Sequence, residues 1–114
     1  MPVKPEFTQF VVEQVGRVVP AVRSRPMFGG VSLSAAEGTF ALIDDDVVYL
    51  KGDKTCRARF EAAGWPPFRP FGDDGSSMAY FAVPGELLEE PESLRPWVEL
   101  SLEAASRVKR KKKT

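Results

Sequence analysis

The chain of 114 residues has the length of one domain, and its 43% hydrophobic and 28% charged content is that of an ordinary globular protein. A chain of this size buries roughly two-thirds of its unfolded surface, so it needs no disulfide or metal staple. The sequence shows neither a secretory signal nor an apolar run long enough to span a membrane. Cys56 is the single cysteine and cannot form an internal disulfide, which favours a cytoplasmic location.

The first predicted element is a helix over residues 5–18. Apolar residues recur there at helical spacing, and Pro20 ends the pattern. Three strands follow, over residues 31–34, 39–44 and 47–51, and the last two are rich in β-branched and aromatic residues. Because the turns between them, AAEG and DDD, are too short for a crossover, we expect the three strands to be antiparallel.

A second helix is predicted over residues 54–64, with Asp53 as its cap and Gly64 as its stop. FRPF, residues 68–71, suits a short edge strand because its proline excludes a central position. A strand over residues 78–83 and a final helix complete the pattern. The apolar stripe of that helix consists of Leu94, Trp97, Val98, Ser101, Leu102 and Ala105. The predicted fold class is an α+β two-layer sandwich in the order helix, three strands, helix, two strands, helix, with a mainly antiparallel sheet.

The end of the sequence, RVKRKKKT, differs in charge from everything before it. The whole chain has 16 basic and 16 acidic residues, whereas residues 1–106 hold ten basic against 16 acidic ones. We therefore expect a folded domain over 1–106 and a basic, disordered tail over 107–114. The tail is interpreted as solubilising. The alternative is weak nucleic-acid binding through its cations, which are Arg107, Lys109, Arg110, Lys111, Lys112 and Lys113.

Several stretches, in this order, resemble a known family. They are RPMFGG, FALI, VYLK, RARFEAAG, PPF, SMAYFAVP and the P…L…W of the last helix. Over roughly residues 25–102 the chain is similar to the N-terminal domain of TfoX-like proteins, which are named after a bacterial regulator of natural competence also called Sxy. The resemblance implies a two-layer sandwich of the secretion-chaperone-like type. The full regulator has a second, C-terminal domain, whereas this chain ends in the basic tail, so control of competence genes is not transferred. The resemblance supplies no catalytic residues.

The stretch RSRPMFGG is the first candidate binding segment. Its double glycine stands where a loop becomes a strand, as required for positive φ or close backbone approach. We interpret the segment as structural, with the Met-Phe pair under the sheet. The alternative is a binding site for an anion or ligand, because arginines beside glycines suit an anion nest. The candidate residues are Arg23, Arg25, Met27, Phe28, Gly29 and Gly30.

The stretch WPPFRPF is the second candidate. Aromatic residues and arginine are favoured at protein interfaces, so Trp65 and Phe68 are candidate contacts for a partner or for a second copy of the chain. The stretch is equally suited to a stiff linker whose aromatic rings fold onto the core.

Catalytic and metal sites are not supported by the residue pattern. The chain contains no His, so Cys56 would have no imidazole base and is interpreted as an inert, buried thiol. The aspartates at 44–46 and 73–74 lack the ligand spacing of a calcium loop and are typical of turns. No cofactor or metal is therefore expected.

The predicted function is that of a small, non-enzymatic regulatory or adaptor module that acts through protein–protein interaction. A homodimer is expected, because the strands carry apolar side chains on both faces and three helices cover one face.

Overall fold

A computed structural model of the protein describes residues 5–27, 30–44, 46–68 and 78–113, with the backbone alone at 27, 78, 79 and 109–113. Within these residues, six strands form one antiparallel sheet in the order β1-β2-β3-β4-β6-β5. The strands are β1 (Arg23–Met27), β2 (Gly30–Ala35), β3 (Gly38–Asp44), β4 (Val47–Lys51), β5 (Pro67–Phe68) and β6 (Met78–Ala82). The helices are α1 (Pro5–Gly16), α2 (Arg57–Ala62), α3 (Gly85–Leu88) and α4 (Pro91–Lys113).

The register of the sheet separates its two faces. Residues paired across neighbouring strands point to the same side, and the next pair along points to the other side. One row of paired residues runs Leu33, Ala41, Leu50, Phe81. The adjacent row runs Arg25, Ser32, Leu42, Tyr49, Ala82. The first row belongs to the hydrophobic core and defines the inner face; the second row defines the outer face.

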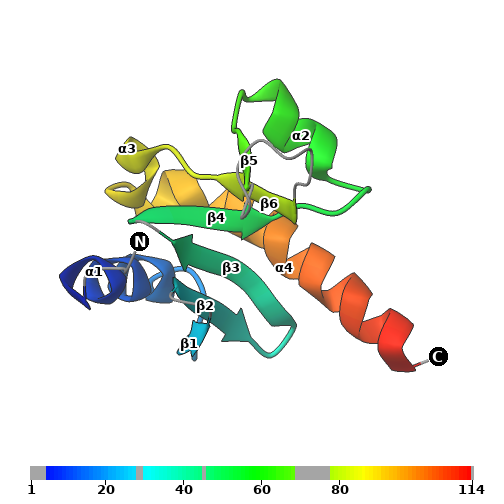
Figure 1. The fold of residues 1–114 in the computed structure, drawn as a ribbon, viewed down its shortest axis with the longest axis horizontal. Helices are drawn as coiled ribbons and strands as arrows, with labels where there is room; N and C mark the ends of the chain where they lie inside the picture. The colour runs from blue at the N-terminus through cyan, green and yellow to red at the C-terminus, as the bar shows by residue number, and fades with distance from the viewer. Residues whose placement is uncertain (1–4, 28–29, 45, 69–77, 114) are drawn as a thin grey trace.

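The described helices pack against the inner face. In Figure 1, α4 passes behind the strands, and it contacts β3 and β4. Its first half buries an apolar stripe on the sheet, which consists of Leu94, Val98, Ala104 and Ala105. Val11 and Val15 of α1 and Leu88 of α3 join the same core. One layer of helices on one face of an antiparallel sheet makes the two-layer sandwich.

An aromatic cluster closes the core at the α2 end of the sheet. The ring of Phe60, which is fully buried, stacks on Phe81 with 5.3 Å between the ring centroids. Trp65 and Trp97 pack beside it, with ring centroids 5.2 and 5.5 Å from that of Phe60. A Cβ at position 52 would stand 2.8 Å from the Phe60 ring, so Gly52 is needed for this packing.

The predicted fold class is confirmed: the protein is α+β, with helices on an antiparallel sheet. The sheet has one more strand in its first half than the sequence predicts. Residues 23–27, expected as a loop, form the edge strand β1, which pairs with β2 from Arg23↔Ser34 to Met27↔Gly30. RSRPM has no alternation of apolar and polar residues, so the period-2 pattern that identifies a strand is missing. An edge strand tolerates both its arginines and Pro26.

The last helix is longer than the sequence predicts. α4 continues through Lys113, past the expected start of a disordered tail at Arg107. Cations in the last turns of a helix interact favourably with its macrodipole, and this opposes the repulsion between like charges. The division of the chain into a domain, 1–106, and a separate tail, 107–114, stays a prediction.

Candidate functional site

The outer face of the sheet combines aromatic rings with cations. The rings of Tyr49 on β4 and Phe68 on β5 are in contact, with centroids 4.6 Å apart and planes tilted by 45°. Both side chains are half-buried, so part of each is accessible from solvent. The Lys51 Nζ stands 5.0 Å from the centre of the Tyr80 ring, at cation–π distance. Burial raises the pKa of Tyr80, which keeps its hydroxyl neutral.

Two arginines extend the outer face to the free edge of the sheet. Arg23 and Arg25 are two residues apart on β1 and are paired with Ser34 and Ser32 on β2. Both arginines are exposed. The Ser32 hydroxyl donates a hydrogen bond of 3.4 Å to the carbonyl oxygen of Arg25. The edge of the outer face therefore presents two guanidinium groups, which are suited to carboxylates or phosphates.

The packing of the sheet backbone, and not a ligand, explains why position 30 is a glycine. A Cβ at this position would stand 2.4 Å from the carbonyl oxygen of Ile43 on β3. The backbones of β2 and β3 approach too closely there for any side chain. This is the close approach that the sequence allowed for Gly30. Phe28 and Gly29 lie outside the described residues, as does the side chain of Met27, so the expected packing of the Met-Phe pair stays a prediction.

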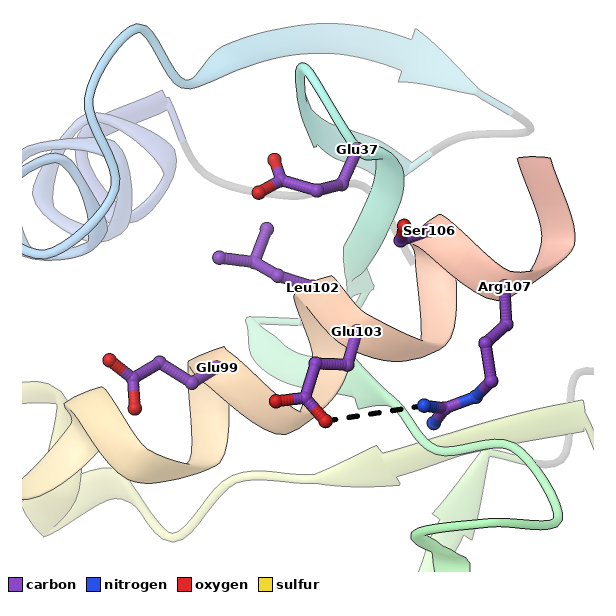
Figure 2. Close-up of a pocket in the computed structure, with 6 residues that line it drawn as sticks. All are labelled: Glu37, Glu99, Leu102, Glu103, Ser106 and Arg107. Carbon is purple, nitrogen blue, oxygen red and sulfur yellow. Dashed lines mark ion pairs between the residues drawn. The ribbon is translucent and has the colours of Figure 1, made fainter. Parts of the chain in front are cut away.

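A groove lies between the middle of α4 and the β2–β3 turn (Figure 2). Its volume is about 500 Å³. It is lined by Glu37, Glu99, Leu102, Glu103, Ser106 and Arg107. Figure 2 shows Glu37 reaching from the turn toward the helix, with Glu99 and Glu103 on the helix itself. Three carboxylates against one guanidinium make the groove acidic.

Arg107 ties the end of this groove to the start of α2. Its Nε and Nη2 atoms donate hydrogen bonds of 2.6 and 2.8 Å to Oδ2 and Oδ1 of Asp53. This bidentate, charge-assisted pair holds the pKa of Asp53 well below its usual range. The backbone N–H groups of Cys56 and Arg57 donate to the carbonyl oxygen of Asp53. The pair therefore joins the start of α2 to α4 through two residues that are 54 positions apart in the sequence.

The Cys56 thiol lies inside this arrangement. The side chain is 3% exposed, and its Sγ donates to Oδ1 of Asp53 at 3.5 Å. Burial raises the pKa of the thiol, with the neighbouring Asp53 carboxylate adding to the effect. The protonated thiol is a poor nucleophile. In the described part of the chain, Cys56 is thus a small core residue.

The structure separates the candidate residues that the sequence puts together. Arg23 and Arg25 are exposed on the edge strand β1, whereas Gly30 begins the neighbouring strand β2, where it allows close approach to β3. Trp65 is 5% exposed and packs on Trp97 with 4.5 Å between ring centroids, so it offers a partner little surface. Phe68, three residues later, lies on the outer face beside Tyr49. Their roles in binding stay predictions.

Two features of the site escape sequence reasoning. The Asp53–Arg107 pair joins distant elements, and nothing in a single sequence marks two such residues as partners. The position of Tyr49 beside Phe68 depends on β5 joining the sheet at its far edge. The sequence predicted an edge strand at 68–71, but it did not show that β5 pairs with β6, which the structure shows.

Within the described ranges, no three His, Cys, Asp or Glu side chains gather to hold a metal ion. Asp46 has a φ of 58°, a left-handed conformation that suits the turn expected at 44–46. Asp45, Asp73 and Asp74 lie outside the described residues. Of the helices that the structure describes, none has the length and apolar composition needed to cross a membrane.

Comparison with known proteins gives one family. The model of the TfoX N-terminal domain matches residues 13–105. This range runs from α1 to the first half of α4 and includes every strand of the sheet. No curated protein matches the chain.

Proposed function

The chain belongs to the TfoX N-terminal domain family, and on that premise we propose that it is a small, non-enzymatic regulatory module of the cytoplasm that binds a protein partner. The domain is that of a competence-regulator-like module. The observation that carries the proposal is the outer face of the sheet, which has exposed arginines on its edge strand β1 and half-buried aromatic rings on β4 and β5. Tyrosine, phenylalanine and arginine are enriched at protein interfaces.

The charge of the outer face favours an acidic partner segment. Arg23 and Arg25 are both exposed on the edge strand, and Lys51 lies on the same face. Residues 1–106 as a whole hold an excess of acidic residues, so the two exposed arginines at this edge of the sheet differ in charge from the domain as a whole. Complementary charge sets the orientation and association rate of a partner more than its final affinity.

The test is a pull-down from native lysate after nuclease treatment, with the intact protein and two outer-face variants, Arg25→Glu and Tyr49→Ala. Arg59→Glu is the matched control, because Arg59 is exposed on α2, in the helix layer. We expect both outer-face variants to lose a partner that the control retains. A partner that the intact protein, both outer-face variants and the control all retain equally would overturn the proposed surface.

We also propose that the protein partner can be a second copy of the chain. The sequence predicts a homodimer from apolar residues on the second face of the sheet. Leu42 and Tyr80 are on the outer face but are already only 5% and 7% exposed within one chain. Among the described large apolar residues, Phe10 and Val108 are the exposed ones, at 38% and 37%. A homodimer would therefore use the aromatic and charged part of the outer face. Sedimentation equilibrium decides this, since a constant mass near 12.6 kDa would exclude a stable dimer.

A further inference from the structure

The C-terminal end of α4 extends past the sheet. Arg107 makes the last described side-chain contact with the body of the domain, through Asp53. Val108 is 37% exposed. In Figure 1 the red end of α4 points away from the strands, toward the C-terminus. We call residues 107–113 the basic helix end; six of its seven residues are Lys or Arg, and none is acidic.

The charge of the domain changes sign at Arg107. Glu99 and Glu103 precede it on α4, and Glu37 faces the same groove. An anionic ligand is repelled by these carboxylates and attracted by the basic helix end. Because the Asp53 carboxylate already neutralises Arg107, the cations available to a ligand are the five at positions 109–113.

The pattern of the basic helix end distinguishes between two anionic ligands. Residues on an α-helix follow one another at steps of about 100°. The five consecutive positions 109–113, all Lys or Arg in the sequence, are therefore distributed around the whole helix axis. A helix that binds a membrane surface needs a broad apolar side with Leu, Phe or Trp. The basic helix end has Val108 alone as an apolar residue. A helix with cations on all sides instead suits the major groove of a duplex, where phosphates lie on both sides of the helix.

We propose that the basic helix end is a nucleic-acid-binding element that contacts phosphates of duplex DNA without reading sequence. Lysine and arginine, which make up most of this element, are the side chains that most often contact phosphates. The Asp53–Arg107 pair fixes the direction in which the helix leaves the body, so the cations are presented on a helix that is already formed. This function is independent of the outer face, since α4 packs on the other side of the sheet.

The first experiment measures binding of the full chain to a short fluorescent DNA duplex by anisotropy over a series of salt concentrations. The variant Lys111→Gln/Lys112→Gln/Lys113→Gln removes three cations and keeps good helix-forming residues. We expect at least about a tenfold loss of affinity at low salt and a salt slope smaller by up to about 2.7, since each phosphate contact contributes about 0.9. The control variant Arg17→Gln/Lys54→Gln/Arg59→Gln removes three exposed cations from elsewhere and should bind as the wild type does.

The second experiment tests whether the helix matters, beyond the charge. Val108→Gly and Val108→Ala have the same charge, but glycine lowers helix stability relative to alanine. We expect weaker DNA binding for Val108→Gly than for Val108→Ala. Equal binding by the two variants would mean that the cations act as an unstructured chain and would overturn the helical part of the proposal.

Three outcomes would overturn the nucleic-acid assignment itself. The triple glutamine variant would bind DNA with the affinity and salt slope of the wild type. A second such outcome is that the wild type binds one duplex but not another duplex of scrambled sequence. Vesicles that contain phosphatidylserine would bind the wild type more tightly than DNA does at the same salt concentration. Selective loss of DNA binding in the glutamine variant, with equal affinity for both duplexes, would support the proposal.

Discussion

The two halves of α4 are continuous in backbone and opposite in chemistry. The half from Leu94 to Ala105 packs on β3 and β4 and carries part of the core. The half from Arg107 to Lys113 is basic and extends beyond the sheet. Packing of an amphipathic face stabilises the first half, as in most protein helices. The second half depends on helix propensity and on the macrodipole, so its conformation is open to change by a ligand. The pair Asp53–Arg107 marks the boundary between them.

The largest expected effect comes from the packed half. Leu94 is 1% exposed and lies in the core cluster. Leu94→Ala removes buried methyl groups and leaves a cavity, so we expect a loss of about 2–5 kcal/mol in the free energy of unfolding. Urea denaturation followed by tryptophan fluorescence measures it. Leu102→Ala is the matched control, since Leu102 lines the open groove and is half-buried. Equal losses for the two variants would contradict the division of the helix into a packed and an open side.

The second effect concerns a polar group within the packed half. Ser101 is fully buried, and its hydroxyl donates a hydrogen bond of 2.7 Å to the carbonyl oxygen of Lys51 at the end of β4. Ser101→Ala removes the donor and leaves a carbonyl oxygen in the core without it, which costs about 1–3 kcal/mol. Thermal unfolding should show a lower Tm with unchanged helix content. An unchanged Tm would mean that this hydrogen bond contributes no net stability.

The third effect tests the boundary. Asp53→Asn removes the charge that pairs with Arg107, and we expect a loss of about 1–2 kcal/mol at neutral pH, because both side chains keep some contact with water. The pKa of Asp53 is lowered in the folded protein. The pair therefore stabilises the fold at neutral pH and loses its contribution as the pH falls below about 4, where the unfolded chain takes up the proton first.

Urea denaturation of the wild type and the Asp53→Asn variant at a series of pH values checks this. The wild type should lose more stability than the variant between about pH 5 and pH 2. Glu61→Gln serves as the control, since the Arg57–Glu61 pair is exposed and such pairs contribute little. Parallel pH profiles for the wild type and Asp53→Asn would show that the pair does not stabilise the fold.

The sequence predicts the packed half of α4 well and the boundary poorly. Helical spacing predicted one stripe of six residues. Four of them are buried and two, Trp97 and Leu102, are half-buried; the buried ones are Leu94, Val98, Ser101 and Ala105. Alternation of apolar and polar residues in β2, and β-branched and aromatic residues in β3 and β4, predicted these three strands. β1 was missed because RSRPM shows neither signal. It becomes a strand through pairing with β2 rather than through its own preference.

The candidate site was less predictable than the fold. Asp53 was expected to cap α2, but that helix begins at Arg57 and its N-cap residue is Cys56. The backbone carbonyl oxygen of Asp53 accepts hydrogen bonds from the N–H groups of Cys56 and Arg57. The bond of the Asp53 side chain to Arg107 depends on α4 crossing behind the sheet, a long-range feature that spacing in the sequence does not contain. Trp65 and Phe68 have similar sequence surroundings, yet one lies in the core and the other on the outer face. The direction of the chain between α2 and β5 decides that difference.

The smallest expected effect comes from the projecting half itself. Removing residues 109–114 deletes five cations that lie beyond the last described contact with the body. Repulsion among those cations is relieved, while their favourable interaction with the helix end is lost, and both effects amount to a few tenths of a kcal/mol for each pair or charge. We therefore expect the free energy of unfolding of the chain 1–108 to stay within about 0.5 kcal/mol of the wild type.

A chain shortened by two further residues sharpens the comparison. The chain 1–106 also lacks Arg107, so it should lose about as much stability as Asp53→Asn, on the order of 1–2 kcal/mol. Because Asp53 and Arg107 act as one pair, combining Asp53→Asn with the shorter chain should cost little more than either change alone. Urea denaturation of the four proteins forms a double-mutant cycle for this contact. Fully additive losses would place the stabilising contacts of Asp53 within its own turn. Non-additive losses, together with an unaltered 1–108 chain, would locate the end of the folded domain at Arg107.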